Sequence, residues 1–217
     1  MSREESTKTE DYIIEHFAKE DADLVRVRER LLADNKFGVN VSAAEGKFLQ
    51  FLVGVVSPKL VVEVGTLYGY STLWMAKALS NESRIISIEH NKEHYERARE
   101  HAAASNVAHK IDIRHGDARA LLPTLGVTPD MVFIDADKPG YRHYLDWAMQ
   151  TVRIGGVIIG DNTFLFGHML GEDRGQKTSP AAIESMRYFN MTLAMAPNFR
   201  AIMLPTYEGM TLAQRLS

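Results

Sequence analysis

Short apolar runs alternate with amphipathic segments from about Lys59 to the end of the chain. Runs rich in Val and Ile predict strands, and apolar positions at helical spacing predict helices. The predicted strands cover residues 60–64, 84–89, 110–115, 130–135 and 155–161. Between them, helices are predicted from Ser71, from Asn91, just after His115 and over 141–150. This alternation is typical of a parallel sheet built from strand–helix units.

The predicted fold class is α/β, with a doubly wound, Rossmann-like sheet that carries helices on both faces. Its strand segments are apolar almost without interruption, as in strands covered on both sides. After a helix predicted over 181–196, runs at 199–206 and 209–216 predict two further strands joined by a tight corner at 207–209. The sheet therefore has seven strands, and its last hairpin adds an antiparallel strand.

The first part of the chain predicts helices that precede the sheet. The first helix is predicted over 11–18 and the second over 21–33, and a third begins at Ser42. Glu45 stands three residues after Ser42, the spacing of a capping box. One stretch, 167–180, is rich in Gly and charge and predicts an open loop. No boundary is visible, so we expect one domain over 1–217, with N-terminal helices over 1–57 and an α/β core over 58–217.

Composition excludes several classes of function. A formal net charge of −3 at pH 7, without a long basic run, does not favour a nucleic-acid partner. The absence of Cys excludes disulfides and thiolate ligands, so a metal would be held by oxygen or imidazole. No apolar run approaches the roughly 20 residues of a membrane span. We therefore expect a cytoplasmic protein with no membrane partner.

Acidic residues stand at the predicted strand ends, where ligands of such sheets bind. They are Glu63, Glu89, Asp117, Asp135, Asp137 and Asp161. Carboxylates that share one rim repel each other unless something cationic lies among them. A metal ion or a positively charged ligand is therefore expected at this rim.

A glycine loop follows the first predicted strand. Gly65 and Gly69 lie between strand and helix as in nucleotide-binding folds, but Leu67 stands where a pyrophosphate would need glycine. Glu63 beside this turn would repel a pyrophosphate and attract a sulfonium or ammonium. The loop therefore favours a cofactor without phosphates. The alternative is a tight turn with a solvated Glu63.

Two further residues have a functional and a purely structural interpretation. Glu89 follows the glycine turn by roughly 20 residues, where such folds place a ribose-binding carboxylate. Alone, it would be an acid near a helix N-terminus. Ser71 opens the first crossover helix, and capping explains it without a ligand.

A candidate metal site combines the ends of two adjacent central strands. Asp135, Asp161 and Asn162 offer hard oxygen ligands, which suit Mg²⁺ or Ca²⁺ and leave positions for substrate oxygens. Helix capping or a turn is the alternative for these residues and for Asp137. Lys138 is a candidate base beside the metal, or a surface lysine paired with Asp137.

Four segments carry a resemblance to a known family: NVSAAEGKFL from residue 40, VEVGTLYGYST from 62, FIDADK from 133 and GDNT from 160. From about Asp11 to its end the chain resembles the class I S-adenosylmethionine-dependent O-methyltransferases of the caffeoyl-CoA and catechol type, and the short bacterial members above all. The resemblance implies S-adenosylmethionine (SAM), a divalent cation (Mg²⁺ first, with Ca²⁺ or Mn²⁺ as alternatives) and a homodimer.

The resemblance also implies roles for individual residues. The methionine end of SAM would be surrounded by Val41, Glu63, Gly65, Thr66 and Ser71. The ribose and adenine would be bound by Glu89, Asp117 and Ala118. The metal ligands would be Asp135, Asp161 and Asn162, the general base Lys138, and Asp135 and Asp137 would also contact the cofactor.

Two positions depart from the common pattern of this family. His90 stands where an aliphatic residue often covers the adenine, which is compatible with stacking. Phe164-Leu165-Phe166 replaces the Leu-Trp of plant members and makes the plant acceptor doubtful.

The sequence therefore predicts metal-dependent methylation of a hydroxyl on a small catechol-like or phenolic acceptor. Metal chelation would align and ionise the hydroxyl, and Lys138 would accept its proton. The N-terminal helices and the 167–180 loop would shape the acceptor site. Alternatives are a tRNA hydroxyuridine methyltransferase and a protein that only binds the cofactor.

Overall fold

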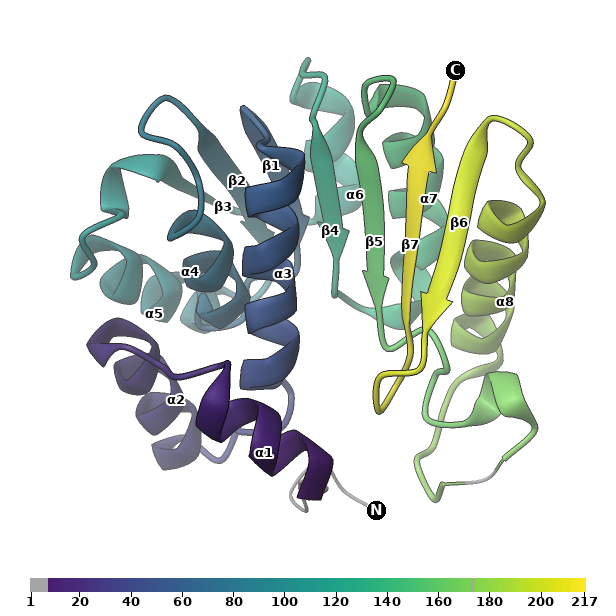
Figure 1. Ribbon diagram of the computed structural model, residues 1–217. Helices are drawn as coiled ribbons and strands as arrows, with labels where there is room; N and C mark the ends of the chain where they lie inside the picture. Colours follow the sequence, from purple (N-terminus) through teal and green to yellow (C-terminus); the bar gives the residue numbers. More distant parts are fainter. Residues whose placement is uncertain (1–7, 173) are drawn as a thin grey trace. The chain divides into compact units, whose positions relative to one another are not determined.

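The computed structural model describes residues 8–172 and 174–217, and the contacts within it define two compact units (Figure 1). Unit 1 holds the chain up to Lys59 and Thr66–His115, and unit 2 holds Leu60–Gly65 and Gly116–Ser217. Within the described residues, none of the helices combines the length and the apolar character that crossing a membrane requires.

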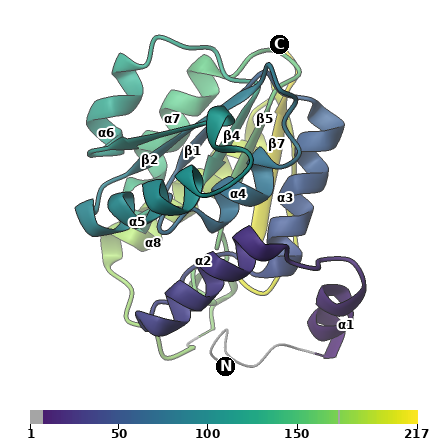
Figure 2. The same ribbon diagram turned by 90° about the vertical axis from the view of Figure 1, so that its left-hand side faces the viewer.

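Unit 1 combines helices with two parallel strands. Its elements are α1 (Lys8–His16), α2 (Ala22–Ala33), α3 (Ala43–Val56), α4 (Tyr70–Ala76), β2 (Arg84–Glu89), α5 (Lys92–Ala103), the 3₁₀ turn η1 (Ala108–Lys110) and β3 (Ile111–His115). β2 and β3 pair in parallel, with Ile85 opposite Ile111. Helices α4 and α5 pack on these strands, and α2 packs on both helices (Figure 2).

The helix starts of unit 1 follow local capping signals. Asp21 caps α2 by accepting from the N–H groups of Asp23 and Leu24. Ser42 and Glu45 form the reciprocal bonds of the predicted capping box at α3. The prediction that Ser71 caps α4 is wrong, because the helix begins at Tyr70 after Gly69 and no side chain caps it. Gly69 takes that place because its φ of 87° favours glycine.

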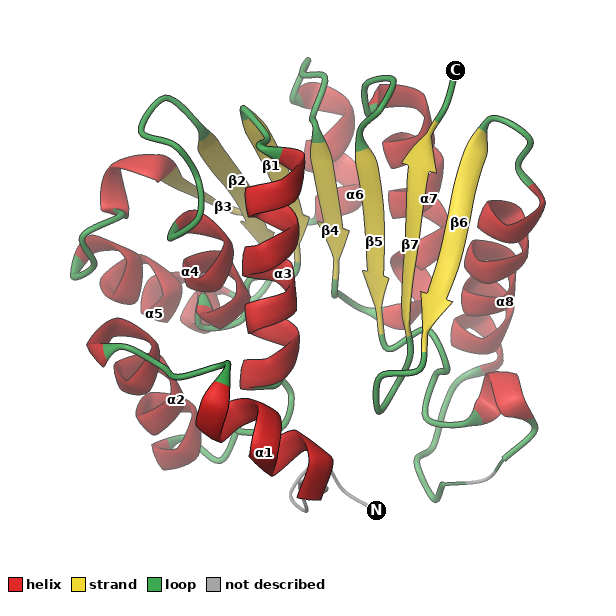
Figure 3. Ribbon diagram, viewed as in Figure 1, coloured by secondary structure: helices red, strands yellow, loops and turns green. Residues whose placement is uncertain are grey.

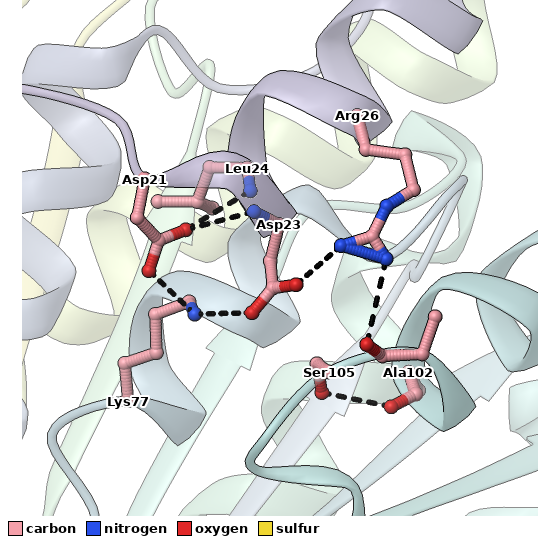
Figure 4. Close-up of polar contacts among 8 residues, drawn as sticks. Asp21, Asp23, Leu24, Arg26, Lys77, Ala102 and Ser105 are labelled. Carbon is pink, nitrogen blue, oxygen red and sulfur yellow. Dashed lines mark hydrogen bonds and ion pairs between the residues drawn. The ribbon is translucent and has the colours of Figure 1, made fainter.

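A partly buried lysine, Lys77, joins the start of α2 to the end of α4 (Figure 4). Lys77 Nζ lies 2.7 Å from Asp21 Oδ2 and 2.8 Å from Asp23 Oδ2. Asp23 also pairs with Arg26 on the next turn of α2. The hydrogen bond from Lys77 holds the pKa of Asp23 below its ordinary value. The start of α2 is therefore tied to α4 by charge as well as by apolar packing.

Unit 2 contains five strands and the helices that connect them. Its elements are β1 (Leu60–Val64), α6 (Ala118–Leu121), η2 (Leu122–Thr124), β4 (Met131–Ile134), η3 (Lys138–Gly140), α7 (Tyr141–Thr151), β5 (Val157–Asp161), η4 (His168–Leu170), α8 (Pro180–Met195), β6 (Phe199–Leu204) and β7 (Met210–Arg215). The strand order is β1-β4-β5-β7-β6. β1, β4 and β5 are parallel, whereas β7 runs antiparallel to β5 and β6 (Figure 3).

The described residues contain seven strands, as predicted, two in unit 1 and five in unit 2. Every residue of β4 is buried, as the apolar run MVFI requires, and α7 and α8 pack on β4 and β6 respectively. The β6–β7 connection covers 205–209 and is wider than the predicted corner at 207–209, since the ladder ends at the Leu204–Met210 pair. The predicted 167–180 loop contains η4 and ends where Ser179 caps α8.

Candidate active site

In unit 1 the glycine loop and the end of β2 meet at Glu89. The N–H groups of Thr66 and Leu67 donate to Glu89 Oε2 over 3.2 Å and 2.8 Å, and the N–H of Asn91 donates to Oε1 over 2.8 Å. Glu89 is 8% exposed. Three backbone donors therefore fix the carboxylate that the sequence assigns to the ribose, and Oε1, which takes only one of these bonds, can still accept a further hydrogen bond.

The turn that aims these donors contains a strained residue. Leu67 has a φ of 50°, in the left-handed region that costs a non-glycine residue about 1–2 kcal/mol. Its N–H makes the shorter of the two loop bonds to Glu89. Glu89 thus offsets the strain of the turn while the turn orients Glu89.

The other predicted cofactor residues of unit 1 lie on neighbouring elements. Val41 is buried and accepts from the Asn40 side chain just before α3. Thr66 is buried with its hydroxyl bonded to that of Ser87, and Ser71 is buried in the first turn of α4. His90 is exposed after β2. Their contacts with SAM stay predictions.

Sequence reasoning missed one residue beside Glu89. His94, in the first turn of α5, places Nδ1 at 3.7 Å from Glu89 Oε1. Burial lowers the pKa of His94, while the Glu89 charge opposes that shift. The sequence signal that could have found His94 is its position in the first turn of the helix predicted directly after the strand that ends at Glu89.

In unit 2 the end of β1 touches the end of β4. Glu63 is fully buried in β1, so the alternative of a solvated Glu63 is wrong. Gly65 has a φ of 98°, and a Cβ at this position would lie 2.0 Å from the carbonyl oxygen of Asp135. Only glycine permits this approach of the loop to β4.

Asp135, Lys138 and Asp161 gather around the hydroxyl of Tyr141, the first residue of α7. Lys138 Nζ donates to Tyr141 over 2.7 Å and lies 3.3 Å from Asp135 Oδ1. The Tyr141 hydroxyl in turn donates to the backbone carbonyl of Asp161 over 2.7 Å. The structure therefore brings together the candidate base and two predicted metal ligands, and Lys138 pairs with Asp135 rather than with Asp137.

Tyr141 was absent from the residues that the sequence singled out. Its position three residues after Lys138 is the signal that could have found it. Burial, followed by the charges of Asp135 and Asp161, raises the pKa of Tyr141 well above its ordinary value. The phenol is therefore neutral at physiological pH and serves as a donor.

Asp137 belongs to a neighbouring group on the same rim. Its Oδ1 accepts from the Tyr144 hydroxyl, and its Oδ2 lies 3.1 Å from Arg119 Nη2. The Asp137 side chain makes no capping bond, but its backbone carbonyl accepts from the Gly140 N–H, so of the two structural alternatives the turn holds and the cap does not. Arg119 also lies 3.5 Å from Asp117, which caps the short helix α6 that begins at Ala118. Arg119 thus links the residues predicted near the adenine with Asp137.

The predicted metal ligands have a suitable chemistry. Asp161 is fully buried at the end of β5, Asn162 is 7% exposed, and the Asp135 side chain is 16% exposed. Asn162 adopts a φ of 55°, which Asn tolerates better than most residues, and its amide nitrogen lies 3.4 Å from Asp161 Oδ2. Across residues 8–172 and 174–217, no three His, Cys, Asp or Glu side chains form a candidate metal group, so the predicted site depends on the Asn162 amide.

The segment after β5 is held by the β6–β7 connection. Glu208, 4% exposed, accepts from the Phe166 N–H over 2.8 Å and lies 3.2 Å from Arg174. The Phe164 ring fills the space beside Gly209, where an added Cβ would lie 2.8 Å away. Glu208 was predicted only as part of a corner, and its partners are too distant in sequence for local patterns to indicate.

Comparison with known sequences places the chain in a family. Residues 14–216 match the O-methyltransferase family. A catechol O-methyltransferase of Niastella koreensis is 36% identical over 93% of this chain and 94% of that protein. Caffeoyl-CoA O-methyltransferase 1 of Arabidopsis thaliana is 34% identical over 82% of this chain and 72% of that protein. The chain belongs to the O-methyltransferase family.

Solved structures agree with this assignment. The O-methyltransferase TomG of Streptomyces achromogenes, solved with SAM, has a TM-score of 0.89 and 31% identity over 100% of both chains. The O-methyltransferase of Bacillus cereus, solved with SAH, has a TM-score of 0.88 and 31% identity over 96% of this chain and 97% of that one. The predicted fold class and the predicted activity, SAM-dependent O-methyl transfer, are confirmed.

Proposed function

We propose that this protein methylates a hydroxyl of a small catechol-like or phenolic acceptor and requires a divalent cation, with Mg²⁺ as the expected ion. The observation that carries the proposal is that Lys138 contacts both Asp135 and the Tyr141 hydroxyl, which in turn donates to the backbone carbonyl of Asp161, so that the residues at the ends of β4 and β5 are joined. The names of the relatives, catechol and caffeoyl-CoA O-methyltransferase, support the class of acceptor.

The donor set fits a hard divalent cation. Asp135, Asp161 and Asn162 would hold it with two carboxylates and one amide, the oxygen ligands that Mg²⁺ prefers. Bound there, the ion would stabilise the ionised form of a chelated hydroxyl. Three protein ligands leave coordination positions for two vicinal acceptor oxygens, which favours a catechol over a lone hydroxyl.

The residues of the chain then supply position and a proton acceptor. Transfer forms a bond between the acceptor oxygen and the methyl carbon while the bond from that carbon to sulfur breaks. The hydroxyl proton moves to Nζ of Lys138, whose side chain is 14% exposed and therefore partly shielded from water. Glu89, held by the glycine loop, would fix the ribose of SAM.

The test is methyl transfer from labelled SAM to caffeic acid, measured with Mg²⁺, with a chelator, and after Mg²⁺ is restored in excess. We expect product with Mg²⁺, loss of at least 90% of it (about tenfold) with the chelator, and recovery when the ion returns. Chelator-resistant product would refute the metal. If SAM binds in calorimetry but no catechol is methylated, the acceptor assignment fails and tRNA becomes the next candidate.

A homodimer, a cytoplasmic location and a single domain over 1–217 remain predictions. The role of residues 1–57 and of the 167–180 segment in shaping the acceptor site is likewise proposed, and belongs with the acceptor assignment. Sedimentation of the purified chain would test the dimer directly.

A further inference from the structure

The Tyr141 hydroxyl is bonded on both sides. It accepts a hydrogen bond from Lys138 Nζ over 2.7 Å and lies 2.7 Å from the carbonyl oxygen of Asp161 and 3.1 Å from that of Ile134. Its single proton can go to only one carbonyl at a time, and the shorter distance favours Asp161. Its lone pairs face the lysine.

The ring of Tyr141 is fixed by its surroundings. Tyr141 is fully buried, and the ring of Phe189 from α8 packs edge-on against it at a centroid distance of 5.3 Å. Lys138 Nζ also lies 4.5 Å from the Tyr141 ring centroid, within the range of a cation–π interaction. A flexible lysine thus lies against a rigid partner.

We propose that Tyr141 is a positioning residue that aims Lys138 at the acceptor hydroxyl, an inference that rests on the proposed function. To accept a proton, Lys138 must react as the neutral amine, whose two N–H groups and one lone pair become the three N–H directions of the ammonium after transfer. Two of them point to Tyr141 and Asp135. The third is left for the proton shared with the acceptor, so the direction of proton transfer is set by Tyr141 and not by the lysine side chain alone.

A different role for the same hydroxyl would be purely structural. By bonding to the carbonyls of Ile134 and Asp161, Tyr141 ties the end of β4 to the end of β5. The two roles differ in one respect. A positioning role acts through Lys138 and disappears when Lys138 is replaced, whereas a structural role persists.

A double-mutant cycle separates the two roles. Tyr141→Phe removes the hydroxyl and keeps the ring, and Lys138→Met keeps the length of the lysine without its nitrogen. We expect Tyr141→Phe to lower kcat about tenfold, the effect of a charge-assisted hydrogen bond, with KM for SAM unchanged. In the Lys138→Met background the same change should alter kcat less than about twofold.

Tyr188→Phe is the matched control. Its hydroxyl donates over 2.8 Å to Asp146, which lies in the middle of α7. It takes no part in the proposed site. We expect it to leave kcat unchanged in both backgrounds. Thermal unfolding of each variant shows whether a loss of kcat reflects a loss of fold.

An equal loss of kcat from Tyr141→Phe in both backgrounds would overturn the proposal, and so would wild-type turnover by Lys138→Met. A crystal structure of Tyr141→Phe gives a readout that does not depend on activity. We expect Lys138 Nζ to leave its position near Asp135, and an unmoved Nζ would overturn the proposal. Absence of methyl transfer by the wild-type protein is a separate outcome, which contradicts the proposed function itself.

Discussion

At the scale of single residues, the carbonyl of Asp135 restricts position 65 to glycine. A Cβ added there would lie 2.0 Å from that oxygen, and the φ of 98° is one that other residues avoid. Both the loop and the end of β4, which carries a predicted metal ligand, would have to move apart. Gly65 thus allows the end of β1 to lie close against the end of β4.

We therefore predict that Gly65→Ala lowers the free energy of unfolding by about 2–4 kcal/mol, the sum of backbone strain and steric overlap. Methyl transfer should fall as well. Gly54→Ala is the control, because Gly54 lies exposed on α3 with open space around it and should gain up to about 1 kcal/mol from helix propensity. Urea denaturation measures both, and equal stability of the two variants would contradict the steric argument.

The sequence alone predicted which residue types the site would use, but not all of their partners. Lys138 and Asp135 could be named because each follows an apolar strand, a pattern visible in consecutive letters. The bond from Tyr141 to the Asp161 carbonyl spans 20 residues, and only the packing of β4 beside β5 brings its partners together. Burial of Glu63 likewise depends on tertiary contacts.

At the scale of elements, the β6–β7 connection anchors the segment that follows β5. Glu208 is buried and accepts from the Phe166 N–H, while Arg174 pairs with both Glu208 and Glu172. The Glu172 side chain is 53% exposed, and that of Glu208 is 6% exposed. Two carboxylates on one arginine therefore differ mainly in burial.

We predict that Glu208→Ala costs about 2–3 kcal/mol of unfolding free energy, because it leaves the Phe166 N–H and Arg174 without a buried acceptor. Glu172→Ala should cost less than about 1 kcal/mol, as an exposed ion pair does. Thermal unfolding of the two variants side by side makes the comparison. A larger loss from Glu172→Ala would show that the anchoring does not depend on Glu208.

Element boundaries were predictable where the signal is local. The α3 capping box needs only Ser42 and Glu45, and Asn91 caps α5 at the predicted start. The start of α4 was misjudged because Gly69 ends the loop by its left-handed backbone and not by a side chain that the sequence displays. The length of the β6–β7 connection depends on where the hydrogen-bonded pairing of the two strands ends, and that pairing joins residues that are distant in sequence.

At the scale of the whole molecule, the order of strands and helices was sufficient to predict the fold class. Each strand–helix unit shows as an apolar run followed by apolar positions at helical spacing. The antiparallel hairpin at the end follows from two apolar strand segments separated by a short polar segment. Glu63 and Leu67 favoured a positively charged cofactor without phosphates and Glu89 a ribose, whereas SAM itself was implied only by the resemblance to a family. Relatives solved with SAM and SAH confirm that class of cofactor.

Because the folded chain binds SAM and the unfolded chain has no site for it, the cofactor should stabilise the protein by mass action. At a SAM concentration of roughly 100 times Kd, unfolding should cost about 2.7 kcal/mol more. For a chain of this size the melting temperature should rise by about 5–10 °C. Calorimetric melting across a SAM titration measures this shift.

The size of that shift also tests the assignment of Glu89 to the ribose. Glu89→Gln keeps an oxygen that can accept from the N–H groups of Thr66 and Leu67, so the glycine loop should persist, while the Asn91 N–H loses its acceptor. It loses the charge that strengthens a hydrogen bond to a ribose hydroxyl, which weakens SAM binding by about tenfold or more. At the same SAM concentration the stabilisation should shrink to about half or less. Glu172→Gln, an exposed carboxylate with no proposed role toward SAM, should keep the full shift, and an undiminished shift in Glu89→Gln would place the ribose on other residues.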